Sequence, residues 1–370
     1  MPRFAVFLTI VLSVWGGMHA YVLSRVWSLP WIAQTGARRW VVAAMALLAV
    51  SYPLARMLSR SLGRSAFPLD VVASVWVGVL FLLLAWLLAA DVVTGFGFLF
   101  REQVPRIRTA AIAVTGLISV VALIQAARPP AVREVEARLP GLPAALDGLV
   151  LVQISDLHLG PMLGESWLAA RIEQVRAFRP DLVVVAGDLV DHDVGKVEGL
   201  VPVLRRLSAP LGVFAVTGNH EFYAGLPRSL AVLEGAGFRV LRDAHAEIAP
   251  GLVLAGVDDP AGRRQMGGDD GFLERALEGR PPGAVVLLSH SPKGVERAAD
   301  LGVGLMLSGH THGGQIWPFR YLVKLAYPRV EGEYRAGGMT LLVSRGTGFW
   351  GPPMRFPRRG EILRITLRAA

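Results

Sequence analysis

The sequence of 370 residues contains no cysteine, so the protein can form neither disulfides nor a thiolate metal site. Cysteine usage therefore does not distinguish a reducing from an oxidising compartment. Acidic residues are scarce in the first third, where 3 Asp and Glu accompany 10 Lys and Arg before Arg128. The rest of the chain has 26 acidic and 28 basic residues, so the formal charge of +9 divides into +7 and +2. Proteins that bind nucleic acids concentrate basic charge on the binding surface, and the near-neutral remainder therefore argues against a nucleic-acid partner.

Charged residues are also rare in four long apolar stretches, residues 5–23, 40–58, 69–90 and 110–127. Crossing the hydrocarbon core of a bilayer takes about 20 helical residues, and "VVASVWVGVLFLLLAWLLAA" (71–90) meets this without a charge. Trp27, Trp31 and Trp40 lie where an interfacial aromatic belt is expected. We therefore expect residues 1–127 to form a membrane domain with about four transmembrane helices. The alternative is a cleaved signal peptide followed by buried core helices, but "GMHA" has Met at the −3 position, a poor fit to the small-residue rule.

These stretches predict a multi-pass protein of the inner (cytoplasmic) membrane. With four spans both chain ends face the same side, and the arginines on the two sides nearly balance. The positive-inside rule then leans towards a cytoplasmic catalytic domain.

The chain changes character after the membrane domain. Residues 128–148 are expected to be a linker with a first strand, because prolines and glycines exclude a continuous helix while Val135, Ala137 and Leu139 alternate. Beyond them, short β-type runs such as "PDLVVVAGD" alternate with stretches of helical period such as "SWLAARIEQVRAF". This pattern predicts an α/β domain with well-buried strands over residues 149–370.

Polar blocks follow five of those runs: "SDLH", "GDLVD", "TGNHE", "LSH" and "SGHTH". They hold five of the eight histidines, a concentration that satisfied core histidines would not produce. Ligands favour the carboxyl ends of strands in α/β sheets, because the loops there converge on one crevice. In the last block, His310 and His312 point the same way if the chain is extended, since they are two residues apart. The five blocks together predict a single site.

In order and residue type the blocks resemble the calcineurin-like metallophosphoesterase superfamily, whose pattern is D-x-H, G-D, G-N-H-[DE], H and G-H-x-H. The resemblance covers roughly residues 149–355. "GHTHGGQIWPF" behind a membrane anchor is similar, more narrowly, to the membrane-associated bacterial branch, which includes phosphodiesterases and enzymes that cleave the pyrophosphate of UDP-2,3-diacylglucosamine. The resemblance implies a four-layer α/β/β/α sandwich with two metals at its upper edge. It implies one metal held by Asp156, His158 and His312, another held by Asn219, His290 and His310, and Asp188 as the bridge between them.

The residue types suit this chemistry. Two divalent ions about 3.5–4 Å apart need a carboxylate that can bridge them, as Asp188 can. Imidazole and oxygen ligands without thiolate favour Mn²⁺, with Zn²⁺ or Fe²⁺ as alternatives. A water between two such ions becomes hydroxide near neutral pH and can attack phosphorus in line. By resemblance, His220 acts on the leaving oxygen as a catalytic residue, steadied by Asp191.

The substrate is less defined by the sequence. Aromatic residues and arginines gather in residues 317–330 and 348–356, directly after metal-site blocks. They form either a lipid-facing surface, with Arg320 and Arg355 as substrate-binding residues, or loops packed on the core of the domain. We expect a metal-dependent phosphoesterase acting on a phosphodiester or pyrophosphate of a lipid or nucleotide-lipid, with membrane lipids as partners. The alternatives are a phosphomonoesterase, a non-lipid phosphodiesterase and a non-catalytic membrane scaffold.

Overall fold

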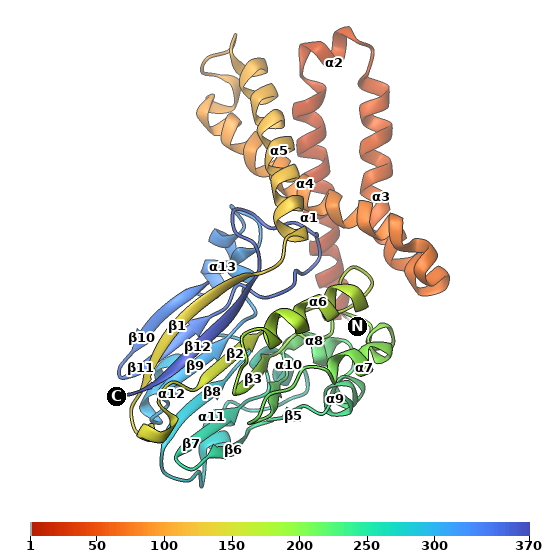
Figure 1. Cartoon of the computed structure of the whole chain (residues 1–370). Helices are drawn as coiled ribbons and strands as arrows, with labels where there is room; N and C mark the ends of the chain where they lie inside the picture. The colour runs from red at the N-terminus through yellow and green to blue at the C-terminus, as the bar shows by residue number, and fades with distance from the viewer. Residues whose placement is uncertain (1) are drawn as a thin grey trace. The chain divides into compact units, whose positions relative to one another are not determined.

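The computed structural model describes the backbone of residues 2–370 and the side chains of that stretch except residues 2–4, 7 and 60–64. The chain divides into two compact units (Figure 1). The helical unit comprises the chain up to Ala127 together with Gly351–Phe356, and the sheet unit comprises Arg128–Trp350 together with Pro357–Ala370. Whether 127/128 and 148/149 bound independently folding domains stays a prediction of the sequence.

The helical unit is built from five helices, α1 (Pro2–Trp27), α2 (Pro30–Gln34), α3 (Arg38–Leu62), α4 (Phe67–Val93) and α5 (Val104–Ala127). Three segments among the described residues are long and apolar enough to cross a membrane, namely Arg38–Ser59, Phe67–Val93 and Val104–Ala127. The sequence predicted about four. The first predicted stretch, residues 5–23, lies within α1, and the side chains of residues 2–4 and 7 of this helix are not described.

A buried ionic cluster joins three helices of this unit. The carboxylate of Asp91, at the end of α4, is 2.5 Å from Arg25 of α1 and 2.7 Å from Arg108 of α5, and it accepts a hydrogen bond from Tyr21. An isolated buried carboxylate costs several kcal/mol, so the pairing is what makes the position tolerable. Residue 91 lies just beyond the predicted third stretch, which is why the apolar pattern did not reveal the cluster.

The sheet unit contains two six-stranded sheets. The first has the order β1 (Ala131–Leu139), β12 (Glu361–Ala369), β2 (Val150–Ile154), β3 (Leu182–Ala186), β4 (Val213–Val216) and β5 (Arg239–Val240). The second has the order β10 (Gly332–Ala336), β11 (Met339–Val343), β9 (Leu305–Ser308), β8 (Ala284–Leu288), β7 (Leu252–Gly256) and β6 (Ala244–Ala249). The runs β2–β3–β4–β5 and β7–β8–β9–β11 are parallel, so their carboxyl ends lie at one edge of each sheet.

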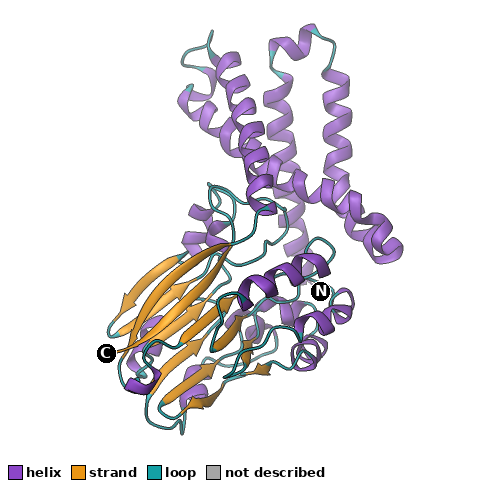
Figure 2. Ribbon diagram, in the orientation of Figure 1, coloured by secondary structure: helices purple, strands orange, loops and turns teal. Residues whose placement is uncertain are grey.

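Side-chain alternation along the strands builds the layers. In β2, Leu151 packs between the two sheets while Val152 faces the helices outside, because successive side chains in a strand point to opposite faces. Helices α6 (Glu165–Arg176), α7 (Val201–Leu204) and α9 (Leu226–Gly235) lie near the first sheet, and α11 (Phe272–Leu277) and α12 (Val295–Asp300) near the second. Figure 2 shows this arrangement of helices outside two stacked sheets. The predicted four-layer α/β/β/α sandwich is therefore confirmed.

Candidate metal centre

The predicted site residues follow the carboxyl ends of strands from both sheets. Asp156 and Asp188 come after β2 and β3, and Asn219 opens α8 (Asn219–Tyr223) directly after β4. His290 comes after β8, and the His310–His312 pair after β9. Three groups of side chains result: Asp156 with His158 and His312, Asp188 with His290 and His310, and His158 with Asp191 and His220. Within each group the ligand atoms all lie within 4.8 Å of one another.

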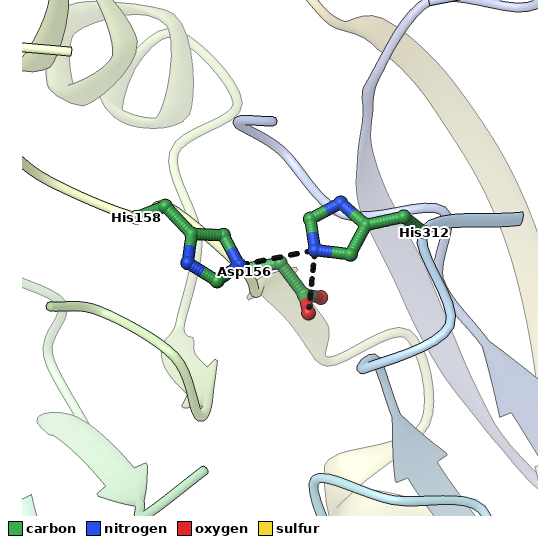
Figure 3. A group of neighbouring side chains, drawn as sticks. All are labelled: Asp156, His158 and His312. Atoms are coloured by element: carbon green, nitrogen blue, oxygen red, sulfur yellow. Dashed lines mark hydrogen bonds and ion pairs between the residues drawn. The ribbon is translucent and has the colours of Figure 1, made fainter. Parts of the chain in front are cut away.

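In the first group, nitrogen and oxygen atoms converge on one point (Figure 3). The Nε2 atoms of His158 and His312 are 3.0 Å apart, and His312 Nε2 is 3.5 Å from Asp156 Oδ1. The backbone amide of His310 donates to the same Asp156 oxygen at 2.9 Å, which ties the loop after β9 in the second sheet to the loop after β2 in the first. The group therefore depends on both sheets.

The second group contains Asp188, whose carboxylate also faces a histidine of the first group. Asp188 Oδ2 is 3.1 Å from His290 Nε2 and 3.7 Å from His158 Nε2, so one carboxylate oxygen faces a histidine of each group. His310 Nδ1 lies 3.3 Å from His290 Nε2. Asn219 Oδ1 is buried, and it has no hydrogen-bond partner among the described residues. A buried acceptor without a partner is costly unless something else satisfies it, as a cation would.

Hydrogen bonds at the far side of two imidazoles fix which nitrogen faces the centre. His290 Nδ1 donates to the carbonyl of Ala186 at 2.8 Å, which leaves Nε2 as the ligand atom. His310 Nε2 is 2.7 Å from the hydroxyl of Tyr327, which leaves Nδ1. Metal-binding histidines commonly hold their second ring nitrogen in this way. The imidazole, carboxylate and amide donors thus fit divalent ions such as Mn²⁺, Zn²⁺ or Fe²⁺.

The backbone is strained at most of these residues. The φ angles are positive at five of them: Asp156 (52°), His158 (45°), Asp188 (51°), His310 (70°) and His312 (50°). Such angles are uncommon outside glycine and cost of order 1–3 kcal/mol each, and they cluster at functional sites. The fold holds these residues in place against their local preference, which is what a preformed site requires.

Glycines in the motifs allow the loops to approach closely. A Cβ atom on Gly218 would lie 2.1 Å from Asp188 Oδ1, and one on Gly309 would lie 2.3 Å from Asp156 Oδ2. No side chain fits at either distance. The glycines of "GNH" and "GHTH" are therefore needed for packing against the carboxylates, while the neighbouring histidines and Asn219 supply the ligand atoms.

Glu221 supports the site and was not singled out from the sequence. Its fully buried carboxylate accepts hydrogen bonds from the backbone amides of Asp188 (3.0 Å), Val190 (3.0 Å) and Gly218 (2.7 Å). Burial and the nearby Asp188 raise its pKa. Glu221 joins the loops after β3 and β4. The acidic residue after "GNH" was the available clue.

His220 lies beside the first group. Its ring is edge-on to His158 with centroids 4.6 Å apart, and its backbone amide donates to Asp188 Oδ1 at 2.9 Å. Its Nδ1 donates to the backbone carbonyl of Asp191 at 2.6 Å, while the carboxylate of Asp191 is 3.6 Å away. That carboxylate lies 3.5 Å from His158 Nδ1 and 2.7 Å from His192 Nδ1. Asp191 therefore holds His220 through its main chain and faces His158 and His192 with its side chain.

The electrostatics of the ligands without ions are mixed. Against the effect of burial, Asp188 raises the pKa of His290 well above its usual range, and Asp191 and Asp188 raise the pKa of His158, so both imidazoles must lose a proton as an ion binds. Burial alone would favour the neutral acid of Asp188, but His290, His220 and His158 hold its pKa well below the usual range. Burial, reinforced by His290, lowers the pKa of His310 to about 4. Burial also lowers the pKa of His220. Asp188 is thus ionised and His310 neutral at physiological pH, the states in which each can bind a metal.

Neither of the two predicted substrate-binding arginines belongs to a ligand group. Arg320 begins α13 (Arg320–Ala326) and forms an ion pair with Glu331 at 3.0 Å. Arg355 is buried in the helical unit, where its backbone amide donates to the carbonyl of Ala122 at 2.9 Å. Their contact with substrate stays a prediction.

The chain is similar in sequence to known proteins. The family model described as calcineurin-like phosphoesterase matches residues 149–314. A protein of Danio rerio named "Transmembrane protein with metallophosphoesterase domain" is 36% identical over 272 residues, 70% of this chain and 62% of that protein. An "Uncharacterized metallophosphoesterase" of Aquifex aeolicus is 39% identical over 227 residues, 59% of this chain and 84% of that protein. The chain therefore spans less than two thirds of the Danio rerio relative and most of the Aquifex aeolicus one.

A solved structure of the sulfate thiohydrolase SoxB from Thermus thermophilus matches 56% of this chain and 53% of its own, with 16% identity and a TM-score of 0.37. The name of the Danio rerio relative and the three apolar segments both indicate a membrane protein.

Proposed function

The chain belongs to the calcineurin-like phosphoesterase family, and we propose that it is a membrane-anchored, two-metal hydrolase of phosphodiester or pyrophosphate bonds. Its substrate is a lipid or nucleotide-lipid. The observation that carries the proposal is the pair of ligand groups that each have a histidine facing Asp188.

The seven predicted ligands divide as the two groups suggest. Asp156, His158 and His312 would hold one ion, Asn219, His290 and His310 the other, and Asp188 both. A pair of divalent ions, most simply Mn²⁺, would supply positive charge next to phosphorus and lower the pKa of water for in-line attack. The strained loops keep the ligands in place before the ions bind, so little reorganisation is needed.

His220 handles the leaving group in this proposal. Because its Nδ1–H donates to the carbonyl of Asp191, Nε2 is the nitrogen that can exchange a proton with substrate. Burial lowers the pKa of His220, so the ring is mainly neutral near pH 7 and must take up a proton before it can donate one to the leaving oxygen. Asp191 fixes the ring without itself touching substrate.

An exposed apolar surface supports a lipid substrate. Helix α13 contains no buried residue, and Phe319, Leu322 and Leu325 are exposed, the last to 83%. We call these three residues the α13 patch. Large apolar side chains gathered on one short helix mark an interaction surface, and the bilayer that the same chain enters offers an apolar partner. Of the two interpretations open from the sequence, the exposure of α13 favours the lipid-facing one for residues 320–326.

The location of the enzyme is part of the proposal. The arginine-rich gaps between the spans suit the inner membrane, and the sheet unit lies on the cytoplasmic side if α1 crosses as a fourth span, the number of spans for which the positive-inside rule leans that way.

A substrate panel tests the function. The full chain in lipid nanodiscs with Mn²⁺ is incubated with phospholipids, UDP-linked acyl sugars, water-soluble phosphodiesters and phosphomonoesters. We expect fastest turnover on a lipid-linked diester or pyrophosphate. Preference for a monoester or a lipid-free diester would replace the proposal by one of the two enzymatic alternatives, and failure on every class would favour the scaffold.

A further inference from the structure

Helix α13 lacks the packing that usually stabilises a helix. None of its seven residues is buried, and five of them are exposed: Tyr321, Leu322, Lys324, Leu325 and Ala326. A helix shorter than about 12–15 residues is marginal in water by itself, and helices in proteins gain most of their stability by packing one face against a partner. We therefore expect a partner on the exposed side of α13.

The bilayer is the partner that the chain itself provides. Three apolar segments are long enough to span a membrane, and the last of them ends at Ala127, one residue before the sheet unit begins. The α13 patch offers three large apolar side chains, and the cation Lys324 is exposed on the same helix. Apolar side chains next to a cation suit the boundary between acyl chains and lipid phosphates.

The start of α13 is attached to a turn that contains a proposed ligand. α13 packs against the one-turn helix η6 (His312–Gly314), and a Cβ atom on Gly314 would lie 2.3 Å from the Cα atom of Arg320. In the connection between them, the side chain of Gln315 donates to the carbonyl of Trp350 at 2.8 Å and accepts from its amide at 3.0 Å. The connection from η6 to α13 is therefore held at a fixed point.

Glu331 supports the same junction. Its carboxylate forms the ion pair with Arg320 at 3.0 Å, and a Cβ atom on Gly313 would lie 2.8 Å from Oε2 of Glu331. One residue earlier in the chain, the carbonyl of Val330 accepts a hydrogen bond from the hydroxyl of Thr311 at 2.5 Å. A displacement of α13 at Arg320 would therefore disturb the turn that follows β9.

The end of α13 is attached to the other histidine of that turn. Tyr327 follows α13 directly, and its hydroxyl lies 2.7 Å from Nε2 of His310, the nitrogen that faces away from the proposed ion. The Nζ atom of Lys293 lies 4.9 Å from the centre of the Tyr327 ring, which gives the ring a second contact. Each end of α13 thus contacts a segment with a proposed ligand.

We propose that α13 is a bilayer contact that positions His310 and His312, with Tyr327 as the positioning residue for His310. The inference rests on the proposed function for the metal ions and for the lipid-facing side of α13. Lipid contact holds α13 in place and reduces the freedom of both histidines, while an ion bound to these histidines restrains α13. Because coupling between two binding events is reciprocal, lipid contact tightens metal binding and metal tightens lipid contact. The centre then binds its ions best at the membrane surface, where a lipid-linked substrate lies.

A spin label on α13 tests the coupling without turnover. The chain has no cysteine, so Leu325→Cys gives a single attachment point at a side chain that is 83% exposed. The labelled full chain in lipid nanodiscs is measured with a chelator and with Zn²⁺, which is diamagnetic, and bound zinc is counted by elemental analysis. We expect zinc to raise the collision rate of the nitroxide with oxygen, which concentrates among acyl chains, and to lower its collision rate with water-soluble chromium oxalate.

Tyr327→Phe removes the hydroxyl at His310 and keeps the ring. The labelled variant should still take up zinc at saturation, with an affinity for one ion that is lower by about 10- to 100-fold, as expected when a residue that orients a ligand is lost. Its label should respond much less to the bound zinc. Tyr321→Phe is the matched control, because it makes the same chemical change on α13 at a side chain that is 60% exposed. It should behave as the labelled chain without this change.

The outcomes separate the coupling from the proposed function. A label whose environment is the same with and without bound zinc would overturn the coupling and leave the metal centre intact. An equal response and equal zinc affinity in Tyr327→Phe would do the same for the role of Tyr327. A label exposed to water in both states would also overturn the lipid contact of α13. A chain that takes up no zinc would overturn the proposed metal centre itself, and the coupling with it.

Discussion

At the scale of single residues, the sequence motifs identified the side chains of the candidate site but not the backbone angles that hold them in place. The blocks "SDLH", "GDLVD", "TGNHE", "LSH" and "SGHTH" predicted which residues meet, because strand ends in an α/β sheet converge. They did not predict positive φ at Asp156, His158 or Asp188, since local preference in those residues opposes it. Glu221 and Gln315 were missed for a related reason: their partners are backbone groups of distant loops, which a single sequence does not show.

Asp188→Asn tests the shared ligand. Loss of a residue that merely supports a ligand costs about 10–100-fold in metal affinity. Removing the charge of a carboxylate that faces both groups should cost more and weaken both ions. Elemental analysis of the purified variant should show depletion of both ions, and full metal content would contradict the bridging role.

His220→Asn separates chemistry from metal binding. We place His220 outside the two ligand groups of the proposal, so the variant should keep its metal, whereas an ion held by the third group, His158, Asp191 and His220, would be lost. Turnover on a chromogenic phosphodiester should fall about 10²–10⁴-fold, the usual contribution of a positioned acid. If metal content falls together with activity, His220 is a ligand and its proposed role is wrong.

At the scale of elements, the sequence predicted which segments form strands better than it predicted which strands pair with each other. The runs ending in the five blocks all became strands of the two sheets. The insertion of β12 between β1 and β2 could not be predicted, because pairing over more than 200 residues is decided by packing between sheets. Residues 317–330 had two interpretations from the sequence, since aromatic residues and arginines occur both in cores and at lipid surfaces; exposure distinguishes them only once the fold is known.

Replacing Phe319, Leu322 and Leu325 by Ser tests the α13 patch. Each substitution removes apolar surface that could enter the boundary between headgroups and acyl chains of the bilayer. The rate on a lipid-linked substrate in bilayers should therefore fall at least about tenfold. The rate on a water-soluble chromogenic diester should change little. Met266→Ser is the matched control, being an exposed apolar residue at the end of α10 (Pro260–Gln265). Equal losses on both substrates would mean that the patch supports the fold.

At the scale of the whole molecule, the chain joins a strongly basic helical unit to a nearly neutral sheet unit that contains every proposed ligand. The composition alone predicted this division into membrane and catalytic parts. It could not show that Gly351–Phe356 groups with the helices, because that segment lies between two strands of the sheet unit in sequence and its hydrogen-bond partner Ala122 lies more than 200 residues earlier.

A fragment of residues 128–370 tests whether the predicted domains fold separately. It keeps both sheets and all ligand residues, so it should fold and hydrolyse a chromogenic diester with Mn²⁺. On a lipid-linked substrate in bilayers it should be much slower than the full chain, since it has lost its anchor. Circular dichroism showing an unfolded fragment would refute the domain boundary.

The central claim is hydrolysis that depends on two metal ions held by this set of ligands. The most direct measurement is a titration of the chelator-stripped full chain with Mn²⁺, following hydrolysis of the chromogenic diester and bound metal together. We predict no activity without metal, and activity that rises to saturation as the second ion per chain is taken up. Activity that survives complete metal removal, or saturation of both sites without any hydrolysis of the substrate panel, would contradict the account.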